Sequence, residues 1–125
     1  IMSSITLVGD TSGQVTLAAP AVAGSNTVTL PASTGNVLID IARSISSNGY
    51  VTFSNGLTIQ WGTCTDGSAV TFPIAFSNAV YAITMSANTG TVNGVPRSTS
   101  QSKTGFTPSF ANVAGGTAYY IAIGN

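Results

Sequence analysis

The apolar residues of this chain come in short runs, and each run breaks within a few residues at Ser, Thr, Asn, Gly or Pro. A membrane-spanning helix needs about 20 mostly apolar residues in succession, so the sequence predicts no membrane span. Strong helix formers other than Ala are scarce, whereas β-branched residues recur between turn residues. This pattern is typical of short β-strands joined by turns. The sequence therefore predicts an all-β fold.

Charged residues are nearly absent. They make up 5% of the 125 residues, whereas soluble domains average about 25%. Three basic and three acidic residues cancel to a net charge of zero, so no long-range field attracts nucleic acid or an anionic membrane. Single-chain domains use charge to stay soluble and monomeric. Since 43% of the residues are hydrophobic, we expect much of the apolar surface to be buried against other copies of the chain.

A loose repeat occupies the N-terminal third of the chain. The stretches ITLVGD, VTLAAP and VTLPAS begin at Ile5, Val15 and Val28. Strands this short are weak alone, and they become stable when several chains cover one another's edges. We interpret residues 1–39 as a β fibre or shaft segment. Because Met2 is not the first residue, we expect a longer parent chain.

The rest of the chain predicts a connector followed by a compact domain. Residues 40–48, DIARSISSN, are the one helix-compatible stretch, and they are too short to form a stable helix alone. Residues 49–125 contain the strand-like stretches LTIQWGTCT, AVTFPIAF, AVYAITMSA and AYYIAIG, separated by turns. This spacing favours a β-sandwich-like domain.

Alternation along residues 57–62 predicts which side chains face inward. Leu57, Ile59 and Trp61 alternate with polar or small residues at the period of two that a strand requires. We assign the apolar set to the core or to an interface between chains. Trp61 is expected to be a core residue rather than a ligand platform, because large aromatic residues dominate burial. The same assignment covers Phe72, Ile74, Phe76, Val80, Ile83, Tyr119, Ile121 and Ile123.

Residues with catalytic or metal-binding chemistry are few. The chain has no His, no Glu and a single Cys, Cys64, so the usual general base and a multi-ligand thiolate site are missing. Asp10 and Asp66 lie in the turn-like contexts GDTSG and TDGS, where Asp bonds its own backbone. A glycosidase needs two carboxylates at a set separation, which only a site shared between chains would supply. We predict no enzymatic activity, no cofactor, no metal and a buried Cys64.

The longest polar stretch, residues 88–104, holds two of the three basic residues. Recognition residues concentrate on loops carried by a rigid scaffold, and hydroxyl, amide and cationic groups suit sugars or phosphorylated lipid heads. A plain solvated hairpin is the alternative. The aromatic residues Phe106 and Phe110 fit either a binding surface or an interface. The predicted receptor-binding residues are Asn88, Thr89, Asn93, Arg97, Ser98, Ser100, Gln101 and Lys103.

Four motifs in order carry a resemblance to a known family. They are NGYVTFSNGLTIQWGTCT, VTFPIAFSNAVYAITMSA, KTGFTPSF and the closing AYYIAIGN. Residues 48–125 on this basis resemble the gp53-like C-terminal domain of phage tail fibres. Residues 13–37 resemble a shorter module that recurs upstream of such tips in phage structural proteins.

The resemblance implies an intertwined homotrimer at a fibre end on the virion, made in the host cytoplasm. It also implies binding to a host surface receptor, a glycan or an outer-membrane protein, and attachment to other phage tail or baseplate proteins. Nucleic acid is not expected as a partner. One alternative is a structural virion fibre or decoration protein without decisive receptor binding. Another is a tailspike-like polysaccharide depolymerase, against which the missing Glu and His weigh.

Overall fold

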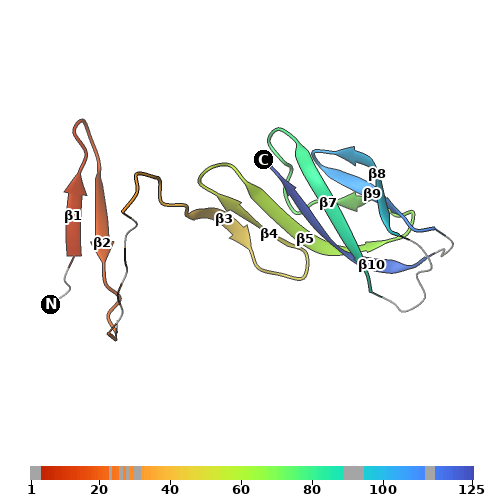
Figure 1. The fold of residues 1–125 in the computed structure, drawn as a ribbon, viewed down its shortest axis with the longest axis horizontal. Coiled ribbons are helices and arrows are strands. Elements are labelled where there is room, and N and C mark those ends of the chain that lie inside the picture. The colour runs from red at the N-terminus through yellow and green to blue at the C-terminus, as the bar shows by residue number, and fades with distance from the viewer. Residues whose placement is uncertain are drawn as a thin grey trace. The chain divides into compact units, whose positions relative to one another are not determined.

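The computed structural model divides the chain into two units, Ile1–Gly35 and Asn36–Asn125, and its regular structure is β-strand (Figure 1). Within the described residues there is no helix, and so none that is long and apolar enough to cross a membrane. The predicted all-β fold is confirmed. The structure describes residues 4–22, 24, 25, 27, 29, 32–88, 95–111 and 115–125.

The first unit contains a β-hairpin. Its strands β1 (Ser4–Val8) and β2 (Gln14–Ala18) pair antiparallel, with Ile5 opposite Leu17 and Leu7 opposite Val15. These four side chains therefore share one face, and each is more than half exposed. An isolated two-stranded hairpin is marginally stable in water. Burial of this apolar face against another surface would therefore stabilise the hairpin. The third strand-like repeat, at Val28, falls partly outside the described residues.

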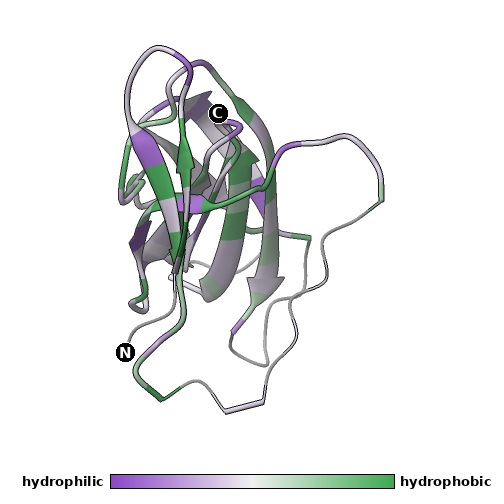
Figure 2. Ribbon diagram, turned by 90° about the vertical axis from the view of Figure 1, so that its left-hand side faces the viewer, coloured by the Kyte–Doolittle hydropathy of each residue, from purple (hydrophilic) through white to green (hydrophobic). Residues whose placement is uncertain are grey.

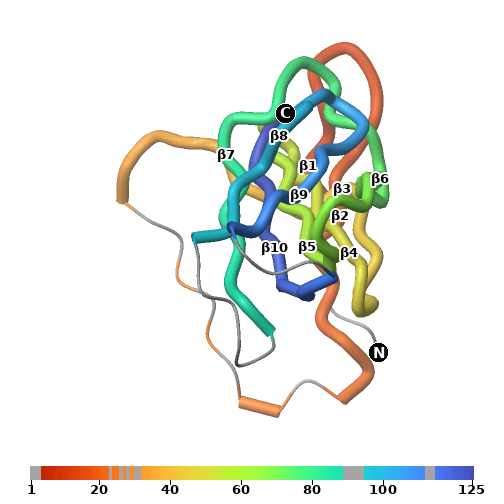
Figure 3. The backbone as a smooth tube through the Cα atoms, turned by 90° about the vertical axis from the view of Figure 1, so that its right-hand side faces the viewer, coloured from red at the N-terminus to blue at the C-terminus, as the bar shows by residue number. Residues whose placement is uncertain are grey.

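The second unit contains two antiparallel sheets (Figures 1 and 3). The last strand of the chain completes the larger sheet by inserting between two earlier strands. In sheet order, the larger sheet is β3 (Asp40–Ser44), β4 (Gly49–Phe53), β5 (Thr58–Thr65), β10 (Thr117–Gly124) and β7 (Val80–Ala87). The smaller sheet is β6 (Val70–Thr71), β9 (Gly105–Ser109) and β8 (Arg97–Ser102).

The interpretation of residues 40–48 as a helix-compatible connector is wrong at residues 40–44. These residues form the edge strand β3, which pairs with β4. A segment this short gains little as an isolated helix, whereas pairing satisfies backbone groups of β4 that would otherwise lack partners. An ion pair of 2.7 Å between Arg43 and Asp40 lies on the exposed edge strand. The structure divides the chain between Gly35 and Asn36 instead.

The two sheets of the second unit pack face to face over an aromatic core. Phe106 and Phe72 come from the side of the smaller sheet, and their ring centroids lie 5.2 and 6.1 Å from that of Tyr120 on β10. Small residues on β5 and β10 make room for these rings. A Cβ atom added to Gly62 would lie 2.9 Å from the Tyr120 ring, and one added to Gly124 would lie 2.6 Å from the Phe76 ring. Large residues therefore pack on small ones.

The buried set partly agrees with the sequence prediction. Phe72 and Phe76 are confirmed as core residues, and Phe106 and Phe110, which the sequence left open, also belong to the core. Cys64 is buried as predicted. The half-buried members of the predicted set are Leu57, Ile59, Trp61, Ile74, Val80, Ile83 and Ile123.

The alternation predicted for β5 is correct, but the buried face is the opposite one. Thr58, Gln60, Gly62 and Cys64 are buried, whereas the odd-numbered residues are half-buried or exposed. The same holds along β10, where Tyr119 and Ile121 are 53% and 46% exposed. Tyr119 and Ile121 therefore lie outside the core of the single chain, and the interface alternative of their core-or-interface assignment stays a prediction. The aromatic rings between the sheets fill the core volume, so the strands face it with small or hydrogen-bonded residues.

Gln60 is the polar exception inside this core, with no exposed surface. Its side-chain Nε2 donates to the carbonyl oxygen of Ile74 at 2.9 Å, and the backbone N–H of Ile74 donates to its Oε1 at 3.0 Å. Buried polar groups are tolerated when they are hydrogen-bonded. Gln60 thus fixes the segment that follows β6 to the centre of the larger sheet.

Candidate functional site

The outward surface of the larger sheet carries aligned apolar side chains. Pairing places Val51, Ile59 and Ile123 in one row across β4, β5 and β10, and Trp61 with Ile121 in the next row. Ile121 in these rows is exposed, whereas Val51, Ile59, Trp61 and Ile123 are half-buried. Large exposed apolar patches are typical of interaction sites. Figure 2 shows hydrophobic residues alternating with polar ones along the strands. We define the outer apolar face as Val51, Ile59, Trp61, Tyr119, Ile121 and Ile123.

Trp61 belongs to this outer apolar face and contacts neighbouring backbone. Its indole Nε1 donates to the carbonyl oxygen of Ser46 at 2.9 Å. A Cβ atom added to Gly49, its partner on β4, would lie 2.6 Å from the indole ring. The ring therefore covers the glycine, with its polar atom already bonded within the chain. Trp61 contributes apolar surface and leaves no polar group to be satisfied by a partner.

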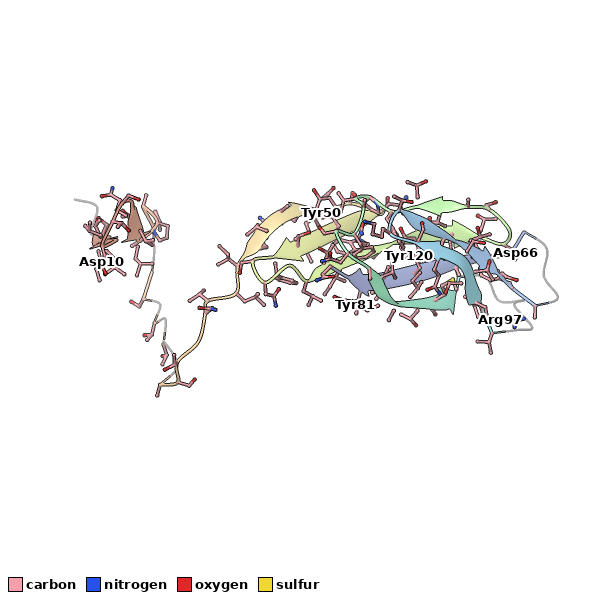
Figure 4. The ribbon with its side chains drawn as sticks, turned by 90° about the horizontal axis from the view of Figure 1, so that it is seen from above. Asp10, Tyr50, Asp66, Tyr81, Arg97 and Tyr120 are labelled. Atoms are coloured by element: carbon pink, nitrogen blue, oxygen red, sulfur yellow. The ribbon has the colours of Figure 1, made fainter. Side chains whose placement is uncertain are left out.

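The polar residues predicted to bind a receptor do not form one cluster. Thr89 and Asn93 lie outside the described residues. Asn88 follows β7, where its N–H donates to Thr117 O at 2.9 Å. Arg97 begins β8 and lies at the same end of the domain as Asp66 (Figure 4). Because a strand rises about 3.3 Å per residue, Arg97 is separated by most of the length of β8 from the turn that carries Lys103.

Ser98 and Ser100 occupy the strand between these two ends. Ser98 is half-buried and its hydroxyl oxygen accepts a hydrogen bond of 2.5 Å from Gln101 Nε2. Ser100 is exposed and has a positive φ of 49°. Neither residue lines the groove that the structure forms at the β8–β9 turn. The predicted set is therefore divided along β8 rather than gathered at one point.

An open groove of about 270 Å³ lies between the beginning of β7 and the β8–β9 turn. It contains Gln101 and Lys103, which the sequence analysis predicted, together with Asn78 and Ser102, which it missed. Lys103 Nζ donates to Ser77 O at 3.2 Å. The turn-like FSNAV motif marks Asn78 as a loop residue, but nothing in it indicates which other loop it meets. The groove is lined by Asn78, Ala79, Val80, Gln101, Ser102 and Lys103.

Two carboxylates of the second unit have structural partners. Asp66 Oδ1 accepts a hydrogen bond of 2.8 Å from the backbone N–H of Phe110, which ties the β5–β6 turn to the end of β9. Asp40 forms the ion pair with Arg43. Over the part of the chain that is described, no group of three or more His, Cys, Asp or Glu residues is placed to hold a metal ion.

Residues 52–125 match the family described as putative tail fiber protein gp53-like, C-terminal. The chain belongs to this tail-fibre family. The match begins inside β4 and covers both sheets except β3 and the first residues of β4. The sequence resemblance to the gp53-like domain is therefore confirmed. No curated protein sequence matches the chain.

Solved structures similar to this chain include tail fibres of pyocins. The N-truncated R2-type pyocin tail fibre has a TM-score of 0.61 and 14% identity, over 84% of this chain and 57% of that one. A P. aeruginosa R2 pyocin fibre has a TM-score of 0.61 and 15% identity, over 82% and 39%. The N-truncated R1-type fibre has a TM-score of 0.53 and 22% identity, over 73% and 88%. At these identities the tail-fibre chain shares their fold, and it spans little more than half of the first R2 structure.

The thiol of the tail-fibre domain is expected to be inert. Burial raises the pKa of the Cys64 thiol, and a hydrogen bond with the Ala118 backbone opposes the shift in part. Because the thiolate is the reactive form, Ellman's reagent should not label the folded protein at pH 8, while denatured protein should react with one equivalent per chain. Rapid labelling of folded protein would show that the sandwich opens at β5.

Proposed function

We propose that this chain forms the distal tip of a tail fibre on a phage or phage-like particle, where it binds a receptor on the host surface. The observation that carries the proposal is the family match over residues 52–125. The receptor is a glycan or an outer-membrane component, and binding leads to adsorption. The protein is made in the host cytoplasm, becomes part of the virion, and joins other tail or baseplate proteins.

The tip is proposed to work as a homotrimer. The outer apolar face and the apolar face of the β1–β2 hairpin each leave large side chains in water within one chain, with Tyr119 at 53% and Ile5 at 64% exposed. A net charge of zero gives no long-range repulsion between copies. Closed rotational symmetry would cover the same face on every chain. Three chains wound about one axis would provide this cover.

The tip is also proposed to act without catalysis. The sequence has no His and no Glu, and Asp40 and Asp66 have the structural partners described above. Incubation of the purified protein with host polysaccharide should release no reducing sugar. Release of sugar would instead favour a depolymerase.

Competition for adsorption tests the proposed function. Purified protein added in excess to host cells should reduce adsorption of the particle that carries this fibre, because free tips occupy the receptors. An unrelated particle with a different receptor should adsorb normally, which controls for nonspecific coating of the cells. Unchanged adsorption at saturating protein would instead support a structural fibre or decoration protein without a decisive receptor.

A further inference from the structure

The groove beside the β8–β9 turn combines several donors of different kinds. Asn78 and Gln101 contribute side-chain amides and Lys103 contributes an ammonium group, while the Ser102 hydroxyl donates to Gly105 O at 3.2 Å and so contributes an acceptor oxygen. No carboxylate side chain is among its lining residues. Its volume of about 270 Å³ is slightly below the roughly 300–1,000 Å³ of small-molecule sites. The groove therefore fits a single sugar unit better than a larger compound.

Both strands that border the groove lose regular pairing next to it. The register of β8 with β9 shifts between Thr99 and Ser102, and Ser100 within this bulge has a φ of 49°. The register of β10 with β7 shifts between Ile123 and Gly124, and Gly124 pairs with Val80 of the groove. Bulges redirect side chains beside binding sites, and strained backbone residues cluster at ligand-binding sites. The strained backbone at Ser100 therefore fits a binding role for the adjacent groove.

The groove is held in shape before any ligand binds. The backbone N–H of Phe76 donates to Lys103 O at 2.9 Å, which joins the segment before β7 to the turn. Lys103 Nζ also donates to Ser77 O, and an ammonium group has three N–H donors. Two donors therefore remain for a ligand. Groups that are already positioned lose little conformational entropy on binding.

The groove also stays accessible in the proposed trimer. The β8–β9 turn belongs to the smaller sheet, which packs on the inner surface of the larger sheet. The outer apolar face lies on the opposite surface of that larger sheet. An assembly that buries the outer apolar face leaves the turn outside the interface. Three grooves per tip would then raise the avidity of a weak individual site.

We infer that this groove binds a cell-surface sugar that carries an anionic group, either a phosphate or a carboxylate. Lys103 pairs with the charge, while Asn78, Gln101 and Ser102 hydrogen-bond the sugar hydroxyls. The inference rests on the proposed receptor-binding function and names its ligand class and site.

Titration of the full chain with defined sugars tests the ligand class. Glucose 1-phosphate and glucuronic acid should shift the backbone amide resonances of Asn78 and residues 101–103, and at least one should bind at least about tenfold more tightly than glucose and inorganic phosphate. Lys103→Ala should weaken that binding at least about tenfold, and Lys103→Arg should retain most of it. Shifts confined to other residues, or binding of inorganic phosphate equal to that of both anionic sugars, would overturn the inference.

A matched pair of variants separates this inference from the proposed function. Asn78→Asp places a carboxylate in the groove and should abolish binding of the anionic sugar and competition for adsorption. Asn55→Asp makes the same charge change in the β4–β5 turn, where Oδ1 accepts from the Leu57 N–H at 3.0 Å, and should behave like the wild type. If the wild type does not compete, the proposed function fails. If the wild type and Asn78→Asp compete equally, the function stands and the groove is not its site.

Discussion

Gln60→Leu should lower the free energy of unfolding by about 2–4 kcal/mol, although it replaces a polar core residue with an apolar one. The side chain has no exposed surface, and its amide satisfies both the N–H and the carbonyl oxygen of Ile74. Leucine has a similar volume but leaves both backbone groups without a partner. Urea unfolding at a fixed chain concentration, followed by tryptophan fluorescence, measures the loss.

Gln60→Glu provides the matched control for the two hydrogen bonds between the Gln60 side chain and the Ile74 backbone. A protonated carboxyl group can donate to Ile74 O and accept from Ile74 N–H, as the amide does, whereas a carboxylate repels the carbonyl oxygen. Burial raises the folded-state pKa of such a group above its unfolded value of about 4.3. The variant should therefore be most stable below pH 4 and lose stability as the pH rises through the folded-state pKa. The assigned role of Gln60 would be contradicted if Gln60→Leu were as stable as the wild type. It would also be contradicted if the stability of Gln60→Glu did not change with pH.

The position of Gln60 shows which part of the fold the sequence predicts. Alternation along β5 gives the strand and its period correctly, because only extended backbone places every second side chain on one face. The choice of face depends on the assumption that apolar residues point inward. In this chain the outward residues Ile59 and Trp61 are larger and more apolar than the inward Gln60 and Gly62. Hydropathy cannot separate a core from an interface between chains.

The residues of the groove were predictable only in part, because the sequence does not show which distant segments meet. Gln101 and Lys103 stand out because cations and amides are concentrated in one polar stretch of a nearly uncharged chain. Asn78 lies more than twenty residues earlier, and the two segments meet through hydrogen bonds from Phe76 N–H to Lys103 O and from Lys103 Nζ to Ser77 O. Arg97 belongs to the same polar stretch as Lys103, yet β8 carries it to the other end of the strand. Long-range pairing decides the composition of the site.

Ile121→Asp should dissociate the proposed trimer. Ile121 is 46% exposed at the centre of the outer apolar face, beside Trp61. In a trimer that buries this face, each chain would place a carboxylate in an apolar contact, at a cost of about 3–5 kcal/mol per chain. Light scattering after size exclusion should give about 37.5 kDa for the wild type, three times the chain mass of 12.5 kDa, and 12.5 kDa for the variant.

Two controls keep this result specific to the outer apolar face. Thr71→Asp adds the same charge to an exposed strand residue of the smaller sheet, so it should remain at the mass of the wild type. Because Ile121 points away from the core, the dissociated variant should still protect Cys64 from labelling, which shows that the sandwich remains folded. A wild type of 12.5 kDa would overturn the trimer. A variant that stays at the mass of the wild type would move the contact to another surface, with the apolar face of the β1–β2 hairpin as the next one to substitute.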